Sequence, residues 1–299
     1  MDNRAEVREF LMSRRAKLTP GDVGLPVDGR RRVPGLRRSE VATLAGVSVE
    51  YYSKIERGGF GGVSPAVLQA LARALRLDAA ERAHLLNLSE AYEGTSVLAR
   101  PRRRSAKPWT PRPALQWVLD AITGGPALVR NGRMDLLATN ALGRAMHAPL
   151  YDRVPVGPPS FARFTFLDDA SHDFYPDWDQ AADICVAILR TEAGRDPHDR
   201  NLQDLVGELS TLSPEFRQRW ARHDVRLHGA GSKSFHHPVV GDLDLAYESV
   251  DMASDPGLTL TIYAAEPGSR TAEALRLLAS WAATPAAPTV SRAPAHSDH

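Results

Sequence analysis

The sequence contains few of the residues on which disulfide and redox chemistry depend. Its 299 residues include a single cysteine, Cys185, inside the apolar stretch 183–189. One cysteine excludes an internal disulfide, and it has no second thiol with which to hold a metal ion. We therefore expect Cys185 to be a small buried hydrophobic side chain.

Long hydrophobic runs are also missing. No segment approaches the ~20 apolar residues that a membrane-spanning helix needs, and residues 1–10 lack the apolar core of a secretory signal. We therefore expect a cytoplasmic protein without a membrane segment. The length of 299 residues and the 43% content of hydrophobic residues are typical of a soluble chain with two domains.

The motifs of common enzyme classes are absent as well. The chain has neither a Gly-rich phosphate loop nor a Gly-x-Ser-x-Gly nucleophile elbow. Histidines are frequent, but His236 and His237 are adjacent in a predicted strand and would point to opposite faces. His223, Asp224 and His228 lie near a predicted helix end without a third ligand at metal spacing. We therefore expect no catalytic residues, no cofactor and no metal.

Charge is distributed unevenly along the chain. Residues 1–112 contain 21 Lys and Arg against 12 Asp and Glu, a net charge of +9, whereas residues 113–299 contain 16 against 24, a net charge of −8. A basic first third followed by an acidic remainder indicates an anion-binding module joined to a domain of another kind. Nucleic acid is the expected anion, because Lys and Arg neutralise its dense phosphates with release of counterions.

Hydrophobic periodicity predicts five short helices in the first domain, residues 1–93. Ser64 followed by Pro65 is a typical helix start, with a capping side chain and a proline in the first turn. Asp78 with Glu81 three positions later is close to a capping box. The first domain is therefore expected to be all-α.

A second domain of mixed structure follows a linker. Residues 94–112 are rich in Pro, Arg and Ser and lack periodicity, as is typical of a linker. Residues 113–281 combine amphipathic helices with strand-like segments, and Asn131 and Gly132 indicate the turn of a hairpin. Residues 282–299 have the composition of a disordered tail. We expect an α/β (α+β) fold for the second domain.

The stretch LAGVSVEYYSKIERG in the first domain has the pattern of two helices joined by a tight turn. Gly46 allows the backbone to turn, Val47 fills the gap between the helices, and Ser48 caps the second helix. Tyr52 and Ile55 are three positions apart and should face the core of the domain. The other face of the second helix is then free to enter the major groove of DNA.

That outer face carries the predicted base contacts. Val49 can touch a thymine methyl group, Glu50 can accept from a cytosine amino group, and Lys54 can donate to guanine. In an isolated helix, Glu50 and Lys54 would be read as a surface pair worth only ~0.3–0.5 kcal/mol, but on a recognition helix base contact is favoured. The remaining predicted DNA-binding residues are suited to phosphate contacts or lie at the helix ends: Arg31, Arg32, Arg37, Arg38, Ser39, Ser48, Tyr51 and Arg57.

The stretch LRRSEVATLAGVSVEYYSKIERG resembles the helix-turn-helix of XRE-type transcriptional regulators. Two positions depart from that pattern, because Arg38 stands where the family often has Gln and Tyr52 replaces the usual Ile or Leu. The stretches LATNALGRAM, ARFTFLDDASHDFYPDWDQAA and LTLTIYAAEPGS resemble the MmyB-like ligand-binding domain that follows this module in many actinobacterial regulators. The resemblance implies a PAS-like sensor domain whose cavity binds a small, largely apolar or amphipathic molecule, fatty-acid-like in some members.

Ligand contacts in such a domain are expected to be large apolar side chains with a few polar anchors. For each aromatic side chain, ordinary core packing is the alternative. We expect a homodimeric regulator that binds a pseudo-palindromic operator in double-stranded DNA and responds to this ligand. In the alternatives, the C-terminal domain serves only dimerisation or protein partnership, or the chain is a DNA-tethered enzyme, which no group of residues supports. The predicted ligand-binding residues are Phe161, Phe164, Phe166, Trp178, Arg190, Trp220, His223 and Tyr263.

Overall fold

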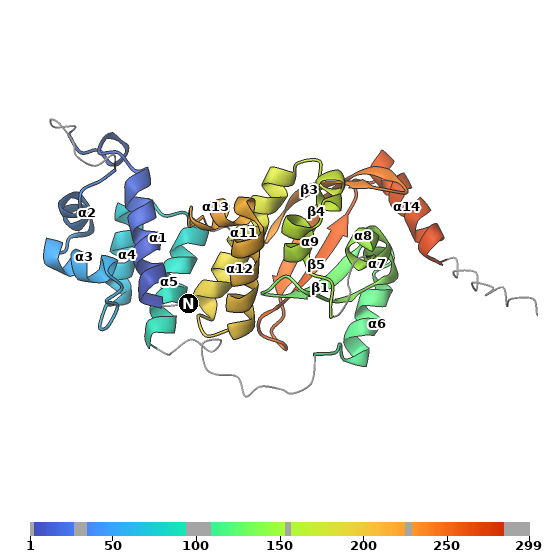
Figure 1. The fold of residues 1–299 in the computed structure, drawn as a ribbon, viewed down its shortest axis with the longest axis horizontal. Coiled ribbons are helices and arrows are strands. Elements are labelled where there is room, and N and C mark those ends of the chain that lie inside the picture. The colour runs from blue at the N-terminus through green and yellow to red at the C-terminus, as the bar shows by residue number, and fades with distance from the viewer. Residues whose placement is uncertain (1–2, 27–34, 94–108, 153–156, 225–228, 284–299) are drawn as a thin grey trace, which may run out of the picture.

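The computed structural model describes residues 3–26, 35–93, 109–152, 157–224 and 229–283. In Figure 1, a helical domain lies on the left and a domain with a β-sheet lies on the right. The prediction of an all-α domain followed by an α+β domain is therefore confirmed. Within these residue ranges, no helix is long and apolar enough to cross a membrane.

Within its described residues, the N-terminal domain has the five predicted α-helices and one short 3-10 turn. Local side chains start two of the helices as expected. The Ser64 hydroxyl accepts from the amide of Val67, and Asp78 and Glu81 each accept from the backbone amide of the other, at 2.8 and 3.0 Å. The elements are α1 (Asn3–Lys17), η1 (Gly21–Val23), α2 (Arg38–Ala45), α3 (Val49–Glu56), α4 (Pro65–Ala74) and α5 (Ala79–Glu93).

The C-terminal domain contains one antiparallel sheet, with the strand order β2-β1-β5-β4-β3. Its strands are β1 (Ala127–Asn131), β2 (Leu136–Thr139), β3 (Ala230–His237), β4 (Gly241–Asp251) and β5 (Leu258–Ala264). Its helices are α6 (Pro113–Ala121), α7 (Ala141–Met146), α8 (Ala148–Tyr151), α9 (Phe161–Leu167), α10 (Ala170–Phe174), α11 (Trp178–Arg195), α12 (Arg200–Leu212), α13 (Pro214–Trp220) and α14 (Arg270–Ala283). The last helix extends two residues into the segment 282–299 that was predicted as a tail.

The predicted hairpin at Asn131 joins β1 to β2. The side-chain oxygen of Asn131 accepts from the amides of Arg133 and Asp135, both at 2.9 Å, and its amide group donates to the Asp135 carboxylate at 2.8 Å. These bonds add to two backbone bonds in the turn, from the amide of Asn131 to the carbonyl of Asp135 at 3.2 Å and from the amide of Met134 to the carbonyl of Asn131 at 3.0 Å.

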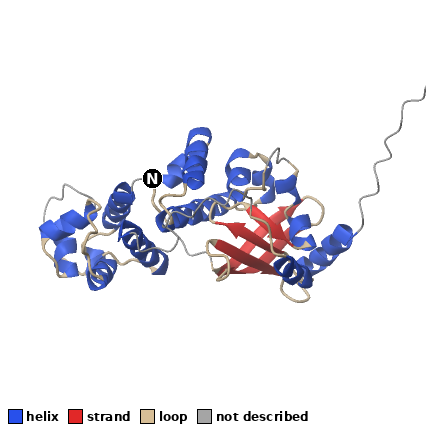
Figure 2. Ribbon diagram, turned by 90° about the horizontal axis from the view of Figure 1, so that it is seen from below, coloured by secondary structure: helices blue, strands red, loops and turns tan. Residues whose placement is uncertain are grey.

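The two faces of the sheet, whose strands are red in Figure 2, pack into different hydrophobic cores. Leu128 and Phe235 point toward the large core that also contains side chains from α7 and from α9 to α13. Ala127 and Val129 point to the other face, where they meet Leu119 of α6. This alternation is the two-residue period of a strand. The adjacent pair in β3 follows it as predicted, because His237 is buried and His236 is exposed.

Candidate DNA-binding surface and ligand cavity

The second helix of the predicted helix-turn-helix is α3, and its first turn is fixed by the chain around it. Gly46 ends α2 with a φ of 67°, a left-handed conformation that glycine adopts without strain. The Ser48 hydroxyl then accepts from the amide of Tyr51 at 3.1 Å. The turn and the cap that the sequence predicted therefore set the direction of α3 relative to α2.

The inner face of α3 is held by a buried carboxylate as well as by apolar packing. Tyr52 and Ile55 are fully buried, which confirms their predicted place in the core. Glu56, 1% exposed, accepts from Arg15 Nε at 2.7 Å, from Arg38 Nε, and from the Tyr52 hydroxyl at 3.3 Å. This role of Glu56 could not be predicted from the sequence, because its partners on α1 and α2 are distant in sequence.

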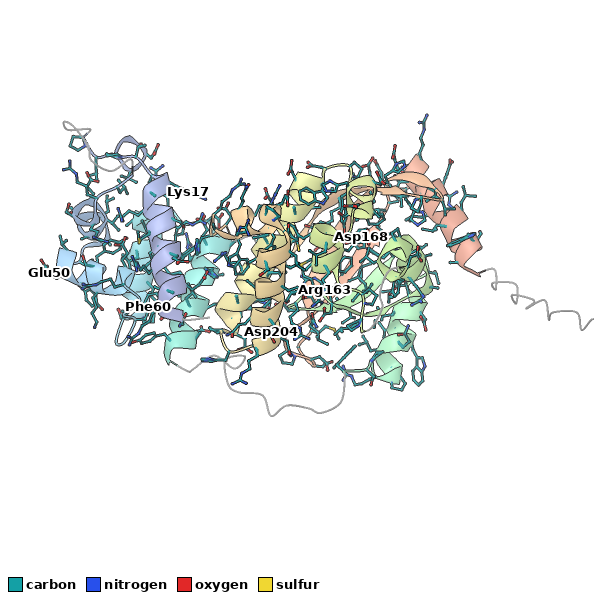
Figure 3. The ribbon with its side chains drawn as sticks, in the orientation of Figure 1. Lys17, Glu50, Phe60, Arg163, Asp168 and Asp204 are labelled. Carbon is teal, nitrogen blue, oxygen red and sulfur yellow. The ribbon has the colours of Figure 1, made fainter. Side chains whose placement is uncertain are left out.

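The outer face of α3 is open to solvent. Val49, Glu50 and Lys54 are exposed, and Figure 3 shows Glu50 at the end of the molecule farthest from the sheet domain. Among the described residues, no ion pair joins Glu50 to Lys54. Lys54 instead lies 3.5 Å from the carbonyl of Gly61. This geometry leaves the Glu50 carboxylate available to a base edge.

The residues predicted to contact phosphates surround this face. Arg37, Ser39, Ser48 and Arg57 are exposed, and Tyr51 is partly exposed. Arg57 donates to the carbonyl of Ser53 at 3.1 Å and so folds back along the helix. Arg38 is half exposed while it pairs with Glu56, so it contributes to the fold as well as to the surface. Arg31 and Arg32 lie outside the described residues.

A cavity of about 300 Å³ lies in the C-terminal domain, between the sheet and the helices α9 and α11. One part of its wall is apolar, from Leu128, Phe161, Ile184 and Phe235. Such a volume is at the lower end of the range for small-molecule sites. Cys185 also lines the cavity and is 2% exposed, and burial raises the pKa of its thiol to about 12. This agrees with the prediction that it is a buried apolar residue.

The cavity wall also contains two basic side chains. Lys233 of β3 and Arg130 of β1 both line it, together with Ser232, Thr261 and Tyr263. Loss of hydration lowers the pKa of the Lys233 ammonium to about 7, and the nearby Arg130 charge lowers it further in the same direction. Burial also lowers the pKa of Arg130, against the opposing charge of Glu192. Two cationic side chains therefore line a cavity whose wall also contains apolar side chains, uncharged polar side chains and one acidic residue, Asp177.

Two of the predicted ligand-binding residues, Phe161 and Tyr263, line this cavity. Phe164 and Phe166 are buried in the large core, and Trp178 packs against that core with its indole N–H donating to the Thr165 carbonyl at 3.0 Å. The sequence analysis missed Lys233 and Arg130. A charged residue inside the apolar strand segment ALVRN was the signal that could have pointed to Arg130.

The other three predicted ligand contacts lie at the boundary between the two domains instead. Arg190 of α11 is fully buried and donates to Glu6 Oε1 at 2.5 Å and toward His223 Nδ1 at 2.8 Å. Its guanidinium also lies 4.0 Å from the centre of the Trp220 ring. Arg190, Trp220 and His223 were predicted to contact the ligand, but they belong to the domain interface. The physical reason is that Arg190 of α11 reaches Glu6 of α1, and Trp220 at the end of α13 and His223 just after it lie against its guanidinium.

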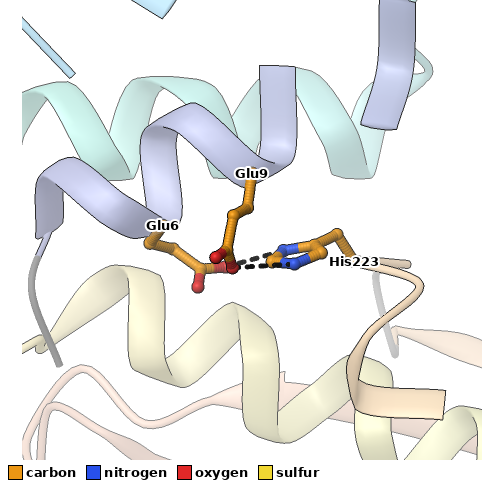
Figure 4. Close-up of side chains that lie close together, drawn as sticks. All are labelled: Glu6, Glu9 and His223. Carbon is orange, nitrogen blue, oxygen red and sulfur yellow. Dashed lines mark ion pairs between the residues drawn. The ribbon is translucent and has the colours of Figure 1, made fainter. Parts of the chain in front are cut away.

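This interdomain cluster comprises ionisable side chains from both domains, together with Trp220. Figure 4 shows three of its members, with Glu6 and Glu9 on one side and His223 on the other. His223 Nε2 lies 3.0 Å from Glu9 Oε2, and Arg14 pairs with Glu81 at 2.5 Å and with Asp224 at 3.2 Å. Burial alone would raise the pKa of Glu6, but the neighbouring His223, His84 and Arg190 hold it well below its usual range. The members are Glu6, Glu9, Arg14, Lys17, Glu81 and His84 from the first domain, and Arg190, Trp220, His223 and Asp224 from the second.

Glu6, Glu9 and His223 each offer a possible metal-ligating atom, and these atoms lie within 4.8 Å of one another. The guanidinium of Arg190 already places a positive charge against both Glu6 and His223. A divalent cation would have to share this buried space with that charge. We therefore assign the group to ion pairing between domains. His228, which the sequence analysis grouped with His223, lies outside the described residues.

Comparison with known families agrees with both halves of this description. Residues 10–85 match the model of a helix-turn-helix domain, and residues 111–278 match the MmyB-like transcription regulator ligand binding domain. The second match covers more than half of the 299 residues. The chain belongs to the MmyB-like transcription regulators. No curated protein gives a significant match to the chain.

Family membership places the two sites in their functional context. An MmyB-like regulator binds DNA through its helix-turn-helix, so the exposed face of α3 is the candidate DNA-binding surface. The cavity between the sheet and α11 lies within the matched ligand-binding domain. The domains are those of a transcription regulator and not of an enzyme family.

Proposed function

We propose that this MmyB-like regulator binds a specific operator and that an amphipathic molecule with an anionic group controls it from the C-terminal cavity. The observation that carries the ligand class is that Lys233 and Arg130 both line a cavity whose wall is otherwise a mixture of apolar and polar side chains. An anion in the cavity would be attracted by both positive charges, whereas an uncharged ligand would not. A hydrocarbon chain would contact Leu128, Phe161 and Ile184, which line the same cavity.

The DNA part of the proposal uses the exposed residues of α3. Val49, Glu50 and Lys54 would contact base edges, while Arg37 and Ser39 would contact phosphates. An eight-residue helix reaches only a few base pairs. We therefore propose a homodimer on a pseudo-palindromic site, since two modules read two half-sites about one helical turn apart.

Dodecanoate is a suitable test ligand, because it joins an apolar chain to one carboxylate. We expect isothermal titration calorimetry to show saturable binding to the full chain and weaker binding of the matched alcohol, dodecanol. The Lys233→Met variant should lose most of the preference for the acid over the alcohol. Equal affinity for the acid and the alcohol would refute the proposed ligand class.

The regulatory part needs a separate measurement. A duplex that the protein selects from a random pool can serve as the operator, and its affinity is then measured with and without saturating dodecanoate. We expect a change of about tenfold, in the usual range of coupling between two sites. An unchanged affinity at saturation would show that dodecanoate binding does not control the protein.

A further inference from the structure

The helix that lines the cavity is also the helix that contacts the DNA-binding domain. Ala181, Ile184 and Cys185 of α11 face the cavity, and Arg190 on the same helix reaches the interdomain cluster. Cys185 and Arg190 are five positions apart, which corresponds to a rise of about 7.5 Å along the helix axis. Since α11 is continuous from Trp178 to Arg195, a displacement of its cavity face must also displace Arg190.

Arg190 is held by partners from both domains. Its side chain is fully buried, and its two terminal nitrogens are held by Glu6, by His223 and by the backbone carbonyl of Trp220. A buried charge that loses its counter-ion is strongly destabilised. The ion pair between Arg190 and Glu6 therefore couples the position of α11 to that of α1.

A second contact between the domains joins His84 to Gly194, and neither residue has much space to move. His84 of α5 is fully buried, and a Cβ atom at Gly194 of α11 would lie 2.6 Å from its Cε1 and 2.7 Å from its Nδ1. Phe10 of α1 packs edge-on against the same imidazole, with ring centroids 4.9 Å apart. The glycine lets α11 approach α5 this closely, and Phe10 leaves the ring little room to move away.

From this interface, α1 extends to the recognition helix. Glu6 near its start belongs to the interdomain cluster, and Arg15 near its end donates to Glu56, the last residue of α3. Both bonds use carboxylates that are at most 5% exposed. One rigid helix thus connects the domain interface to the helix that faces DNA.

We propose that α11 and α1, joined through Arg190 and Glu6, form the device by which occupancy of the cavity sets the orientation of the DNA-binding domain. This inference rests on the proposed function for the identity of the signal, but the docking of the two domains through Arg190 and Gly194 does not depend on it. Arg190 is a positioning residue in this device and contacts neither DNA nor ligand.

The Gly194→Ala variant tests the docking without any change in charge. Alanine favours the helix, so local helix stability should rise, while its methyl group forces α11 away from His84. Gly207→Ala in α12 is the matched control, because a Cβ there has no neighbour within 4 Å. By hydrogen exchange of the full chain, we expect the amides of α1 and α5 to exchange about tenfold faster in Gly194→Ala and to be unchanged in Gly207→Ala. Equal protection in the two variants would overturn the docking role.

The coupling is tested with dodecanoate and the selected operator. Arg190→Met and the milder Glu9→Gln should bind dodecanoate with the affinity of the wild type, because neither residue lines the cavity. The change in operator affinity caused by dodecanoate should fall at least threefold in both variants. If dodecanoate binds and the full response persists in both, α11 and α1 do not carry the signal. If dodecanoate fails to bind the wild type, the ligand proposal fails, while the exchange experiment still decides the docking.

Discussion

Arg15 in α1 donates a hydrogen bond to Glu56 at the end of α3, with an Nε to Oε1 distance of 2.7 Å. The bond joins the N-terminal helix to the recognition helix inside the domain, where Glu56 is 1% exposed. Arg38 from α2 donates to the other carboxylate oxygen of Glu56. Three helices therefore meet at one buried carboxylate, and the orientation of α3 depends on it.

Glu56→Ala should destabilise the N-terminal domain by about 3 kcal/mol, because it leaves Arg15 without its buried counter-ion. Urea unfolding of the full chain measures this loss. Glu50→Ala on the same helix is the matched control. Its side chain is exposed, so stability should change by less than ~0.5 kcal/mol while operator recognition weakens. Similar stability losses in the two variants would contradict the buried role of Glu56.

Lys54→Ala should relax base preference at one operator position, at a cost of about 1–3 kcal/mol for the preferred base. Arg37→Ala should instead weaken binding to all sequences alike and reduce the salt slope by about one. Arg37 is a better phosphate probe than Arg38, since Arg38 also supports the fold through Glu56. Binding-site selection from random duplexes, repeated at several salt concentrations, distinguishes the two effects. Loss of base preference in Arg37→Ala alone would reverse the assignment.

The affinity of the cavity for dodecanoate should fall as pH rises above 7. The pKa of Lys233 in the empty protein is about 7, and a bound carboxylate favours the charged ammonium, so binding at higher pH must take up a proton. The fall approaches tenfold per pH unit until the pKa of the complex is reached. Calorimetry in buffers of different ionisation enthalpy measures the proton uptake directly. Lys233→Met should bind with little pH dependence, and a pH-dependent profile in that variant would point to another group.

His147 should make the folded protein less stable in mild acid. Burial lowers the pKa of this imidazole to about 4, against the opposing effect of its bond to the Gly143 carbonyl. Below the usual histidine pKa of about 6.5, the unfolded chain binds a proton that the folded protein does not, so stability falls as pH decreases from about 6.5 to 4. At pH 5 the loss due to His147 is about 2 kcal/mol.

Urea unfolding at pH 7 and pH 5 measures this effect. In His147→Leu, the difference in unfolding free energy between the two pH values should shrink by about 2 kcal/mol relative to the wild type. His198→Leu, at an exposed position, is the control and should leave that difference unchanged. An unaltered pH response in His147→Leu would show that this imidazole is not held neutral.

Local patterns in the sequence were sufficient for the elements and for the exposed face of α3. The left-handed turn at Gly46, the cap at Ser48 and the hairpin at Asn131 each depend on residues within a few positions of one another. The three-residue spacing of Tyr52 and Ile55 likewise sufficed to place both in the core. Each of these features involves only residues that are close together in the sequence, so the local sequence determines it.

The ligand cavity could be predicted only in part. Aromatic content pointed to Phe161 and Tyr263, but it equally pointed to Phe164 and Phe166, which pack into the core. Whether an aromatic ring borders a cavity depends on which neighbours fill the space beside it. This depends on packing in three dimensions, which the spacing of residues in the sequence does not predict.

The sequence by itself determined the two domains, their charge contrast and the outward face of the recognition helix. Only the tertiary structure decided which charges meet. Arg190 and Glu6 are 184 positions apart, and their pairing exists because α11 packs against the N-terminal helices. Lys233 and Arg130 reach one cavity because the fold brings β3 and β1 around the same space. Burial gives these long-range charge contacts their strength, since the same residues exposed to water would interact only weakly.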